Sequence, residues 1–219
     1  MAKKKTLNNP DIMSLYMNYV LENNKKPSSV YMFCKENKLS ESEFYTHFTS
    51  FEILDKAIFN AFFENSLQVL NKSEDYISFD SRNKLLSFYF TFFENLTANR
   101  SYVLFILEHD KSKLKSLRLL SKLRHSFTSY IDSLDIELLD IQQKQIQELQ
   151  KKALKESAWM QLLITLKFWM DDSSPSFEKT DIFIEKSVNT SFDVLQITPL
   201  KSVLDLGKFL FKEKSKMTV

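Results

Sequence analysis

Residues 30–54 read VYMFCKENKLSESEFYTHFTSFEIL, and this stretch decides the fold. Apolar side chains recur at helical spacing at its start, and Asn37-Lys38-Leu39 then interrupts them. Ser40 and Glu43 have the spacing of a capping box, in which a serine hydroxyl and a glutamate carboxylate accept hydrogen bonds from free amides at a helix start. The stretch therefore predicts a short helix, a three-residue turn, a second short helix ending near His47, and a longer helix after it.

Helical patterns extend on both sides of this stretch. Upstream, Asn9-Pro10-Asp11 opens a helix that Asn23-Asn24-Lys25-Lys26 ends. Residues 135–171 are expected to break where a polar half gives way to an apolar half, and Ser173-Ser174-Pro175 predicts a stop and a restart. The other downstream helical patterns cover residues 82–98, 101–109, 112–131, 176–195 and 199–212.

The composition disfavours folds that need tight turns. The 219 residues include one Gly, four Pro and 20 Phe, which leaves few positions for hairpins or glycine-rich nucleotide loops. The lone Cys34 excludes a disulfide framework and a cysteine-based zinc site, and it indicates a reducing compartment. We therefore expect an all-α protein with a three-helix head over residues 1–50 and a larger helical body over residues 51–219.

The N-terminal sequence Met1-Ala2-Lys3-Lys4-Lys5-Thr6 is basic, but no apolar run of signal-peptide length follows it. No stretch reaches the ~18 uninterrupted apolar residues of a membrane span. The sequence therefore predicts a cytoplasmic protein. Because the formal net charge is only +2, any nucleic-acid binding has to come from local charge.

The string Tyr45-Thr46-His47-Phe48, set in the helix–turn–helix pattern of residues 30–54, resembles the DNA-binding head of TetR-family repressors. The resemblance implies that the third helix enters the major groove of an operator. It also implies a set of DNA contacts, in which Lys3, Lys4, Lys5, Tyr45 and His47 meet phosphates while Ser42 and Thr46 lie near bases.

Three positions of this head depart from the family pattern. Lys38 stands at a turn position where the family prefers glycine, and Phe51 stands where a phosphate-binding lysine is usual. Glu41 and Glu43 lie on the reading helix, so the segment from Leu39 to Ser50 has a formal charge of −2 from these two residues, with His47 neutral. Carboxylates oppose binding to a phosphate backbone. They can instead stabilise the helix N-terminus or accept a hydrogen bond from cytosine.

Residues 170–195, MDDSSPSFEKTDIFIEKSVNTSFDVL, are similar to the C-terminal part of the ubiquinone-biosynthesis lipid-binding proteins. Those proteins share the TetR-like fold, bind isoprenoid lipids in the body, touch membranes through a C-terminal amphipathic helix and assist a quinone-modifying enzyme. The resemblance implies a second possible function, that of a lipid-binding accessory protein without DNA binding. A simpler explanation is that Ser174-Pro175 makes a good helix start in any TetR-like body.

Two sets of apolar residues are candidate binding surfaces of the body. The central helices carry an aromatic set that is either an ordinary core or the lining of an apolar pocket for a lipid or drug: Phe88, Tyr89, Phe92, Phe93, Tyr102, Phe105 and Trp159. The last two helices before residue 196 hold the family's dimerisation position. There a self-complementary face would form a homodimer through Leu162, Leu166, Trp169, Phe183 and Val188.

Residues 199–212 form an amphipathic pattern with Lys201, Lys208 and Lys212 beside its apolar face. Such a helix either closes the body or lies on an anionic membrane. The three histidines are scattered without partners at metal-ligand spacing, and the single glycine excludes a glycine-rich phosphate loop. We therefore expect no metal, no cofactor and no enzymatic activity. The function predicted first is a homodimeric TetR-like regulator that binds operator DNA under control of an apolar ligand.

Overall fold

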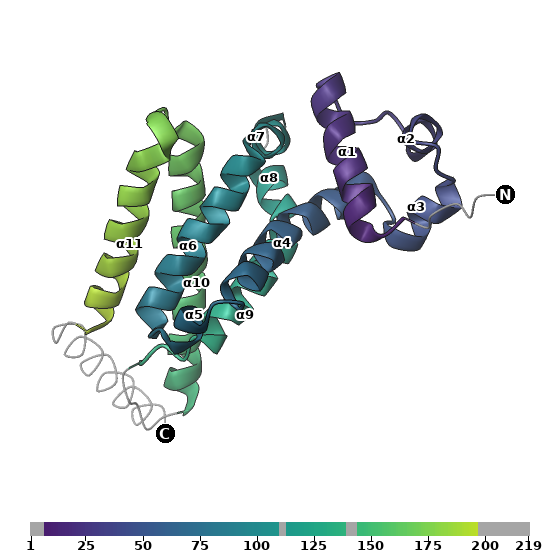
Figure 1. Cartoon of the computed structure of the whole chain (residues 1–219). Helices are drawn as coiled ribbons and strands as arrows, with labels where there is room; N and C mark the ends of the chain where they lie inside the picture. Colours follow the sequence, from purple (N-terminus) through teal and green to yellow (C-terminus); the bar gives the residue numbers. More distant parts are fainter. Residues whose placement is uncertain (1–6, 110–112, 139–143, 197–219) are drawn as a thin grey trace. The chain divides into compact units, whose positions relative to one another are not determined.

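The computed structural model describes residues 7–109, 113–138 and 144–196. Within these ranges the chain is helical and contains no strand, which confirms the predicted all-α class (Figure 1). The helices in chain order are α1 (Asn9–Asn23), α2 (Val30–Glu36), α3 (Glu41–His47), α4 (Phe51–Leu70), α5 (Glu74–Ser78), α6 (Ser81–Ala98), α7 (Arg100–His109), α8 (Lys113–Leu119), α9 (Ser121–Ser133), α10 (Lys144–Asp171), the 3-10 turn η1 (Pro175–Phe177) and α11 (Glu178–Gln196).

Polar side chains start the first five helices. In each of α1 to α5 the residue before the helix accepts a hydrogen bond from the backbone amide three residues later. Each such cap stabilises a helix by about 1 kcal/mol. The sequence therefore encodes these boundaries locally, through Asn8, Ser29, Ser40, Ser50 and Ser73.

Two predicted helix boundaries are wrong. The pattern over residues 112–131 is divided between α8 and α9, which are separated at Leu120. Conversely, α10 continues without a break across residues 144–171, and residues 136–138 before it are not helical. The polar part of α10 is mainly exposed, whereas its apolar part packs on α11. The change of composition along α10 thus reflects a change in what covers the helix, not its end.

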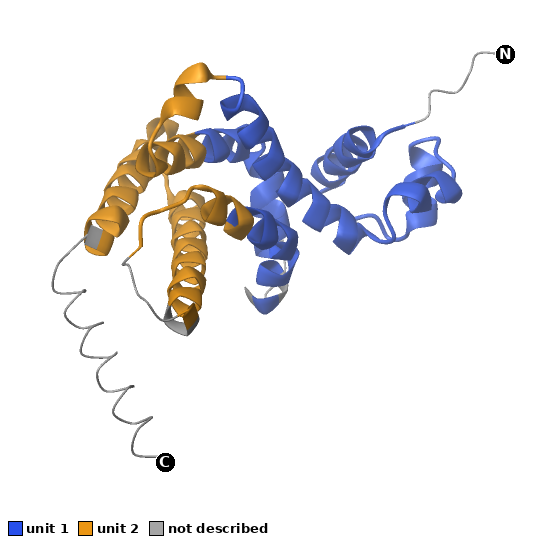
Figure 2. Cartoon of the chain, turned by 90° about the horizontal axis from the view of Figure 1, so that it is seen from below, with its two compact units in different colours: residues 1–72, 91–127 blue, residues 73–90, 128–219 orange. Residues whose placement is uncertain are grey.

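Close packing divides the chain into two units (Figure 2). Unit 1 comprises residues 1–72 and 91–127, and unit 2 comprises residues 73–90 and 128–219. Helices α6 and α9 contribute to both. The boundary predicted between head and body after residue 50 falls inside unit 1, between α3 and α4, and it stays a prediction.

Helix α4 is the centre of unit 1. Its buried side is mostly apolar but includes Asp55, Asn60 and Ser66, and α8 packs along the helix. The Asn60 Oδ1 atom accepts a hydrogen bond from the Ser126 hydroxyl of α9 at 2.7 Å. Two residues further along α4, the Phe62 carbonyl accepts a hydrogen bond from the Asn95 side chain of α6 at 3.0 Å. These bonds satisfy polar groups that would otherwise destabilise the core, and they fix α6 and α9 at set positions along α4.

In unit 2, α10 and α11 pack side by side and are joined by a turn built around Asp172. The Asp172 carboxylate is buried and accepts hydrogen bonds from the backbone and side chain of both Ser174 and Thr180, at 2.7–2.9 Å. Burial disfavours the charged form, but these bonds outweigh it and hold the pKa of Asp172 at about 2, against 3.8 for the free side chain. The turn therefore depends on an ionised Asp172.

We expect Asp172→Asn to destabilise the protein by about 1–3 kcal/mol at pH 6, because an amide cannot accept all four hydrogen bonds. A carboxylate whose pKa falls on folding stabilises the folded state above its unfolded pKa, and this contribution is lost as the pH falls towards the folded value near 2. Urea unfolding should therefore show the gap between wild type and variant closing from pH 6 to pH 2. Asp171→Asn, which changes the exposed neighbour paired with Lys167, should have little effect at either pH.

Candidate functional site

The turn between α2 and α3 sets the geometry of the head. The Leu39 amide donates to the Cys34 carbonyl at 2.8 Å and the Lys38 amide to the Lys35 carbonyl at 3.4 Å. This pair of hydrogen bonds is a Schellman motif, which ends a helix with one residue in the left-handed conformation. Lys38 is that residue, with φ 58°. The position where the sequence departs from the family's glycine is therefore one where the backbone favours glycine.

Helix α3 presents a polar face to solvent. Ser42, Tyr45 and Thr46 are exposed, with 50% of Tyr45 accessible, whereas Phe44 is buried against Phe33 of α2. Of the residues predicted to contact DNA, these three lie together on one exposed helix face. The Thr46 hydroxyl donates to the Ser42 carbonyl at 2.8 Å, so its oxygen can still accept a hydrogen bond.

His47 and the N-terminal lysines are placed differently. His47 is half-buried, and its Nδ1 atom is hydrogen-bonded to the Asn9 side chain of α1. The ring therefore links α3 to α1. Lys3, Lys4 and Lys5 lie outside the described residues.

The two glutamates of α3 are not equivalent. The Glu43 amide donates to the Ser40 hydroxyl at 3.1 Å, as the capping pattern predicted. The half-buried Glu43 carboxylate accepts from the Leu7 amide at 3.5 Å, so it also serves the segment that leads into α1. Glu41 is exposed at the N-terminus of α3, where its charge favours the helix dipole. The negative charge of the face is therefore carried mainly by Glu41.

The aromatic residue at the start of α4 belongs to the core of the head. Phe51 stacks on Tyr16 of α1, with ring centroids 5.3 Å apart and planes inclined by 16°. It also meets Phe33 and Phe44 edge-on, at 5.7 and 5.6 Å. An aromatic side chain thus stands where a phosphate-binding lysine would be expected, and it joins α1, α2, α3 and α4. The sequence showed the substitution but not this reason for it.

The aromatic set predicted to line a pocket is divided between the two units. Phe92, Phe93, Tyr102 and Phe105 belong to unit 1, whereas Phe88, Tyr89 and Trp159 belong to unit 2. All except the half-buried Phe105 are buried. In unit 2, Phe88 packs on Tyr130, with centroids 4.9 Å apart. The pocket assignment stays a prediction, and each side chain already contributes to the core of its own unit.

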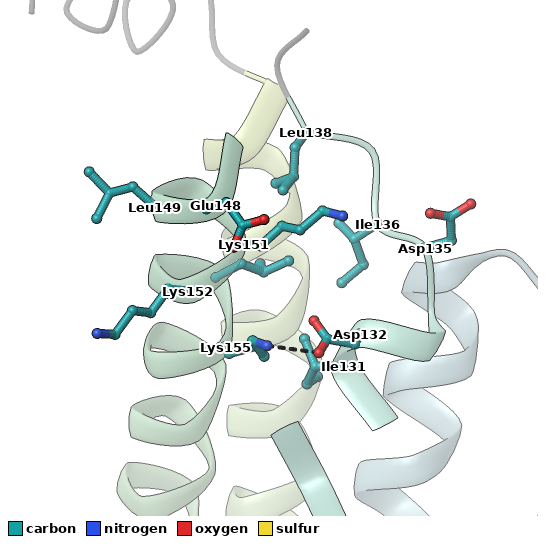
Figure 3. A pocket seen from close by; sticks show the side chains of 11 residues that line it. Ile131, Asp132, Asp135, Ile136, Leu138, Glu148, Leu149, Lys151, Lys152 and Lys155 are labelled. Carbon is teal, nitrogen blue, oxygen red and sulfur yellow. Dashed lines mark hydrogen bonds and ion pairs between the residues drawn. The ribbon is translucent and has the colours of Figure 1, made fainter. Parts of the chain in front are cut away.

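Unit 2 contains a hollow of about 610 Å³ where the end of α9 faces the start of α10 (Figure 3). Lys155 and Asp132 form an ion pair at 2.8 Å on its wall, and Lys151 extends towards Ile136 across it. No sequence pattern indicates this hollow, because its wall comes from α9, α10 and residues 135–138. Its lining is Ile131, Asp132, Asp135, Ile136, Leu138, Glu148, Leu149, Lys151, Lys152, Leu154 and Lys155.

Most of the residues predicted for the dimer face are already buried within a single chain. Leu162, Leu166, Trp169 and Val188 are all buried. Phe183 is half-buried and stacks on Phe168 at 4.6 Å, with planes inclined by 9°. The large apolar residues of α10 and α11 that are exposed to solvent are instead Leu149, Met160, Ile164, Phe168, Ile182 and Val194.

Among the described residues, no group of three or more His, Cys, Asp and Glu side chains could hold a metal ion. None of the described helices is long and apolar enough to cross a membrane. The predicted amphipathic helix over residues 199–212 lies outside the described residues.

Over the described residues the fold is all-α, and near its N-terminus two short helices, α2 and α3, are joined by a Schellman turn. A family model described as the C-terminal domain of tetracyclin repressor-like proteins matches residues 84–210, more than half of the chain. The chain therefore belongs to the TetR family. A comparison with curated proteins gives no match.

The left-handed backbone at Lys38 gives a direct test of the turn. We expect Lys38→Gly to stabilise the protein by about 1 kcal/mol, because a side chain is disfavoured at positive φ and glycine is not. Thermal unfolding should show the gain as a higher Tm. Lys38→Ala keeps a Cβ atom and should bring no such gain, and Lys35→Gly, inside α2, should instead lower stability by roughly 1 kcal/mol. A lower Tm for Lys38→Gly than for Lys38→Ala would contradict the turn geometry.

Proposed function

We propose that the protein is a DNA-binding regulator that acts as a homodimer, with α3 as its reading helix and an apolar or amphipathic molecule as its ligand. The observation that carries the proposal is the exposed face of Ser42, Tyr45 and Thr46 on a helix that a Schellman turn holds against α2. Hydroxyl groups on such a face suit contacts with base edges and phosphates. Membership of the TetR family supports the same function.

The negative charge of α3 limits the affinity for DNA that we expect. Glu41 is exposed on α3 and opposes the approach of a phosphate backbone. Because Glu43 is half-buried and bonded to the N-terminal segment, only one carboxylate is fully presented to DNA. We therefore expect binding that is weaker than for a basic reading helix, and that relies on Tyr45 and on the Lys3–Lys5 arm.

The ligand part of the proposal draws on the hollow at the start of α10. Its volume, about 610 Å³, lies in the usual range for small-molecule sites. The lining combines the apolar side chains of Ile131, Ile136 and Leu154 with charged groups of both signs, namely Lys151, Lys152, Lys155, Asp132, Asp135 and Glu148. Such a lining suits a molecule with an apolar part and a polar part.

The homodimer is proposed to form through the exposed side of α10 and α11. Met160, Ile164 and Phe168 recur every four residues and so share one face of α10, and Ile182 is exposed on α11. A two-fold axis beside these helices would pair the same apolar stripe from each copy. The proposed contact is therefore formed by residues that neighbour Leu162, Leu166, Trp169 and Val188. These four are buried within the chain, so they hold α10 and α11 in place on the side opposite the proposed contact.

The alternative function, a lipid-binding accessory protein without DNA binding, is favoured by one observation. The described part of α3 bears Glu41 and Glu43 but no lysine or arginine, so the electrostatic attraction that most DNA-binding helices use is missing from it. The hollow of unit 2 serves this function as well as the first. DNA selection separates the two.

The DNA test uses selection from a random DNA pool at low salt, followed by affinity measurements on the recovered sequence. We expect Tyr45→Ala to weaken binding about tenfold on specific and unrelated DNA alike, because a phosphate contact carries no sequence information. Tyr45→Phe, which removes the hydroxyl alone, should reproduce most of this loss. Phe90→Ala, at an exposed aromatic residue of unit 2, is the control and should leave affinity unchanged. Selection that recovers no consensus would reject DNA binding and leave the accessory function.

The dimer test compares two charged substitutions at exposed aliphatic positions. Ile164→Arg should convert the dimer into a monomer of 25.9 kDa, because it buries an unpaired charge in the proposed contact. Val69→Arg changes a comparably exposed residue on α4 and should leave the dimer intact. Light scattering at micromolar concentration distinguishes these results. A wild-type monomer, or an Ile164→Arg variant that stays dimeric, would rule out this surface.

A further inference from the structure

Asp55 of α4 is a buried carboxylate that two distant segments share. Its side chain is fully buried, and its Oδ2 atom lies 2.7 Å from the Lys26 ammonium, in the loop between α1 and α2. Its Oδ1 atom accepts a hydrogen bond from the Tyr102 hydroxyl of α7 at 2.8 Å. The Asp55 carboxylate thus contacts the loop between α1 and α2 through Oδ2 and α7 through Oδ1.

Other contacts around this carboxylate join the same segments. The ring of Tyr16 in α1 meets the ring of Tyr102 edge-on, with centroids 6.4 Å apart, and α1 packs on α7. The Tyr16 hydroxyl is buried close to Asp55 without a hydrogen bond of normal geometry. Burial, and then the charge of Asp55, raise the pKa values of Tyr16 and Tyr102, so both tyrosines stay protonated and are able to donate.

The electrostatics make the two partners of Asp55 interdependent. Burial raises the pKa of Asp55, while the Lys26 ammonium and then the Tyr102 hydroxyl oppose that rise. When a buried carboxylate loses one of its two partners, the remaining partner compensates only part of the free-energy cost of burying the charge. A shift of α7 that breaks the bond from Tyr102 therefore changes the free energy of the Lys26–Asp55 pair as well.

We propose that Asp55 couples α7 to the head: Lys26 and Tyr102 hold the two oxygens of one buried carboxylate, so that a displacement of α7 loosens the loop between α1 and α2, and loosening of that loop releases α7. If the head binds DNA as proposed above, this coupling is a route by which a change in the body alters the position of α3. The coupling itself does not require DNA, and it is measured without it.

The experiment is hydrogen exchange, followed by mass spectrometry, on the full chain without DNA. Tyr102→Phe keeps the ring and its contact with Tyr16 but removes the bond to Asp55. We expect it to accelerate amide exchange in α1 and in residues 24–29 roughly ten- to a hundredfold, while α10 and α11 keep their rates. Lys26→Met should accelerate exchange in α7 in the same way. The double variant should exchange scarcely faster than either single one, because both act on one carboxylate.

Two controls separate coupling from general loss of stability. Tyr76→Phe removes a buried hydroxyl that is hydrogen-bonded to Tyr130 at 2.9 Å within unit 2, and it should leave exchange in α1 and α7 unchanged. Lys26→Arg keeps the charge and should restore slow exchange in α7. Urea unfolding verifies that each variant is folded. Faster exchange in all helices alike after Tyr102→Phe, or unchanged exchange in α1, would overturn the proposal.

A second measurement links the coupling to regulation. On a DNA sequence recovered by selection, Tyr102→Phe should change affinity several-fold although Tyr102 is buried and cannot touch DNA. If no DNA is bound but the exchange result holds, the proposed function fails while the coupling stands. If DNA is bound and exchange in α1 does not respond to Tyr102→Phe, the coupling fails while the function stands.

Discussion

The rest of unit 1 depends on the polar groups that α4 buries. A helix with a purely apolar face can slide or rotate against its neighbours at little cost, but a buried carboxylate, amide or carbonyl has to meet its own partner. Asp55 meets Lys26 and Tyr102, Asn60 meets Ser126, and the carbonyl of Phe62 meets Asn95. These bonds therefore fix the register of α1, α7, α9 and α6 on one helix. The same helix follows α3 directly, so the head and the helices around α4 are held by a single element.

The head combines a strong local fold with a surface unusual for DNA binding. Its core is aromatic: Phe33 and Phe51 pack against Tyr16, and Phe44 packs against both of them. Placing Phe51 in that core removes a position from which a lysine could reach a phosphate, and α3 adds no positive charge of its own. A side chain at position 51 can therefore either complete the aromatic core of the head or contact a phosphate, but not both. The proposed function consequently rests on hydroxyl groups and on the N-terminal arm rather than on a basic face.

In unit 2, α10 and α11 have an inner side that packs in the core and an outer side that is exposed to solvent. The inner sides of α10 and α11 bury Trp169, Leu162 and Ile184 against the chain's own core, and the Asp172 turn sets the approach of the two helices. Their outer sides leave Met160, Ile164 and Ile182 in solvent. The homodimer is proposed on this apolar stripe because α10 and α11 are already held in place by the core, so little further ordering is needed when a second copy covers the stripe.

The sequence by itself determined the features that depend on neighbouring residues. Capping side chains, the S-x-x-E spacing at Ser40 and the scarcity of glycine were enough to predict the all-α class, the bounds of α1 and α3 and the start of α4. The resemblance of the Tyr45–Phe48 string to TetR-family heads indicated the family. The predicted break in α10 was wrong, and the sequence did not show which apolar residues of α10 and α11 are buried within the chain. Only the tertiary structure decided that Leu166 is buried while Ile164 is exposed, that Phe51 completes the aromatic core of the head, and that Lys26 and Tyr102 meet on Asp55. Helical periodicity shows that apolar residues share a side, but it does not show which neighbour covers that side. Likewise, a charge pairs across 29 or 47 residues only when the packing of several helices brings its partner within reach.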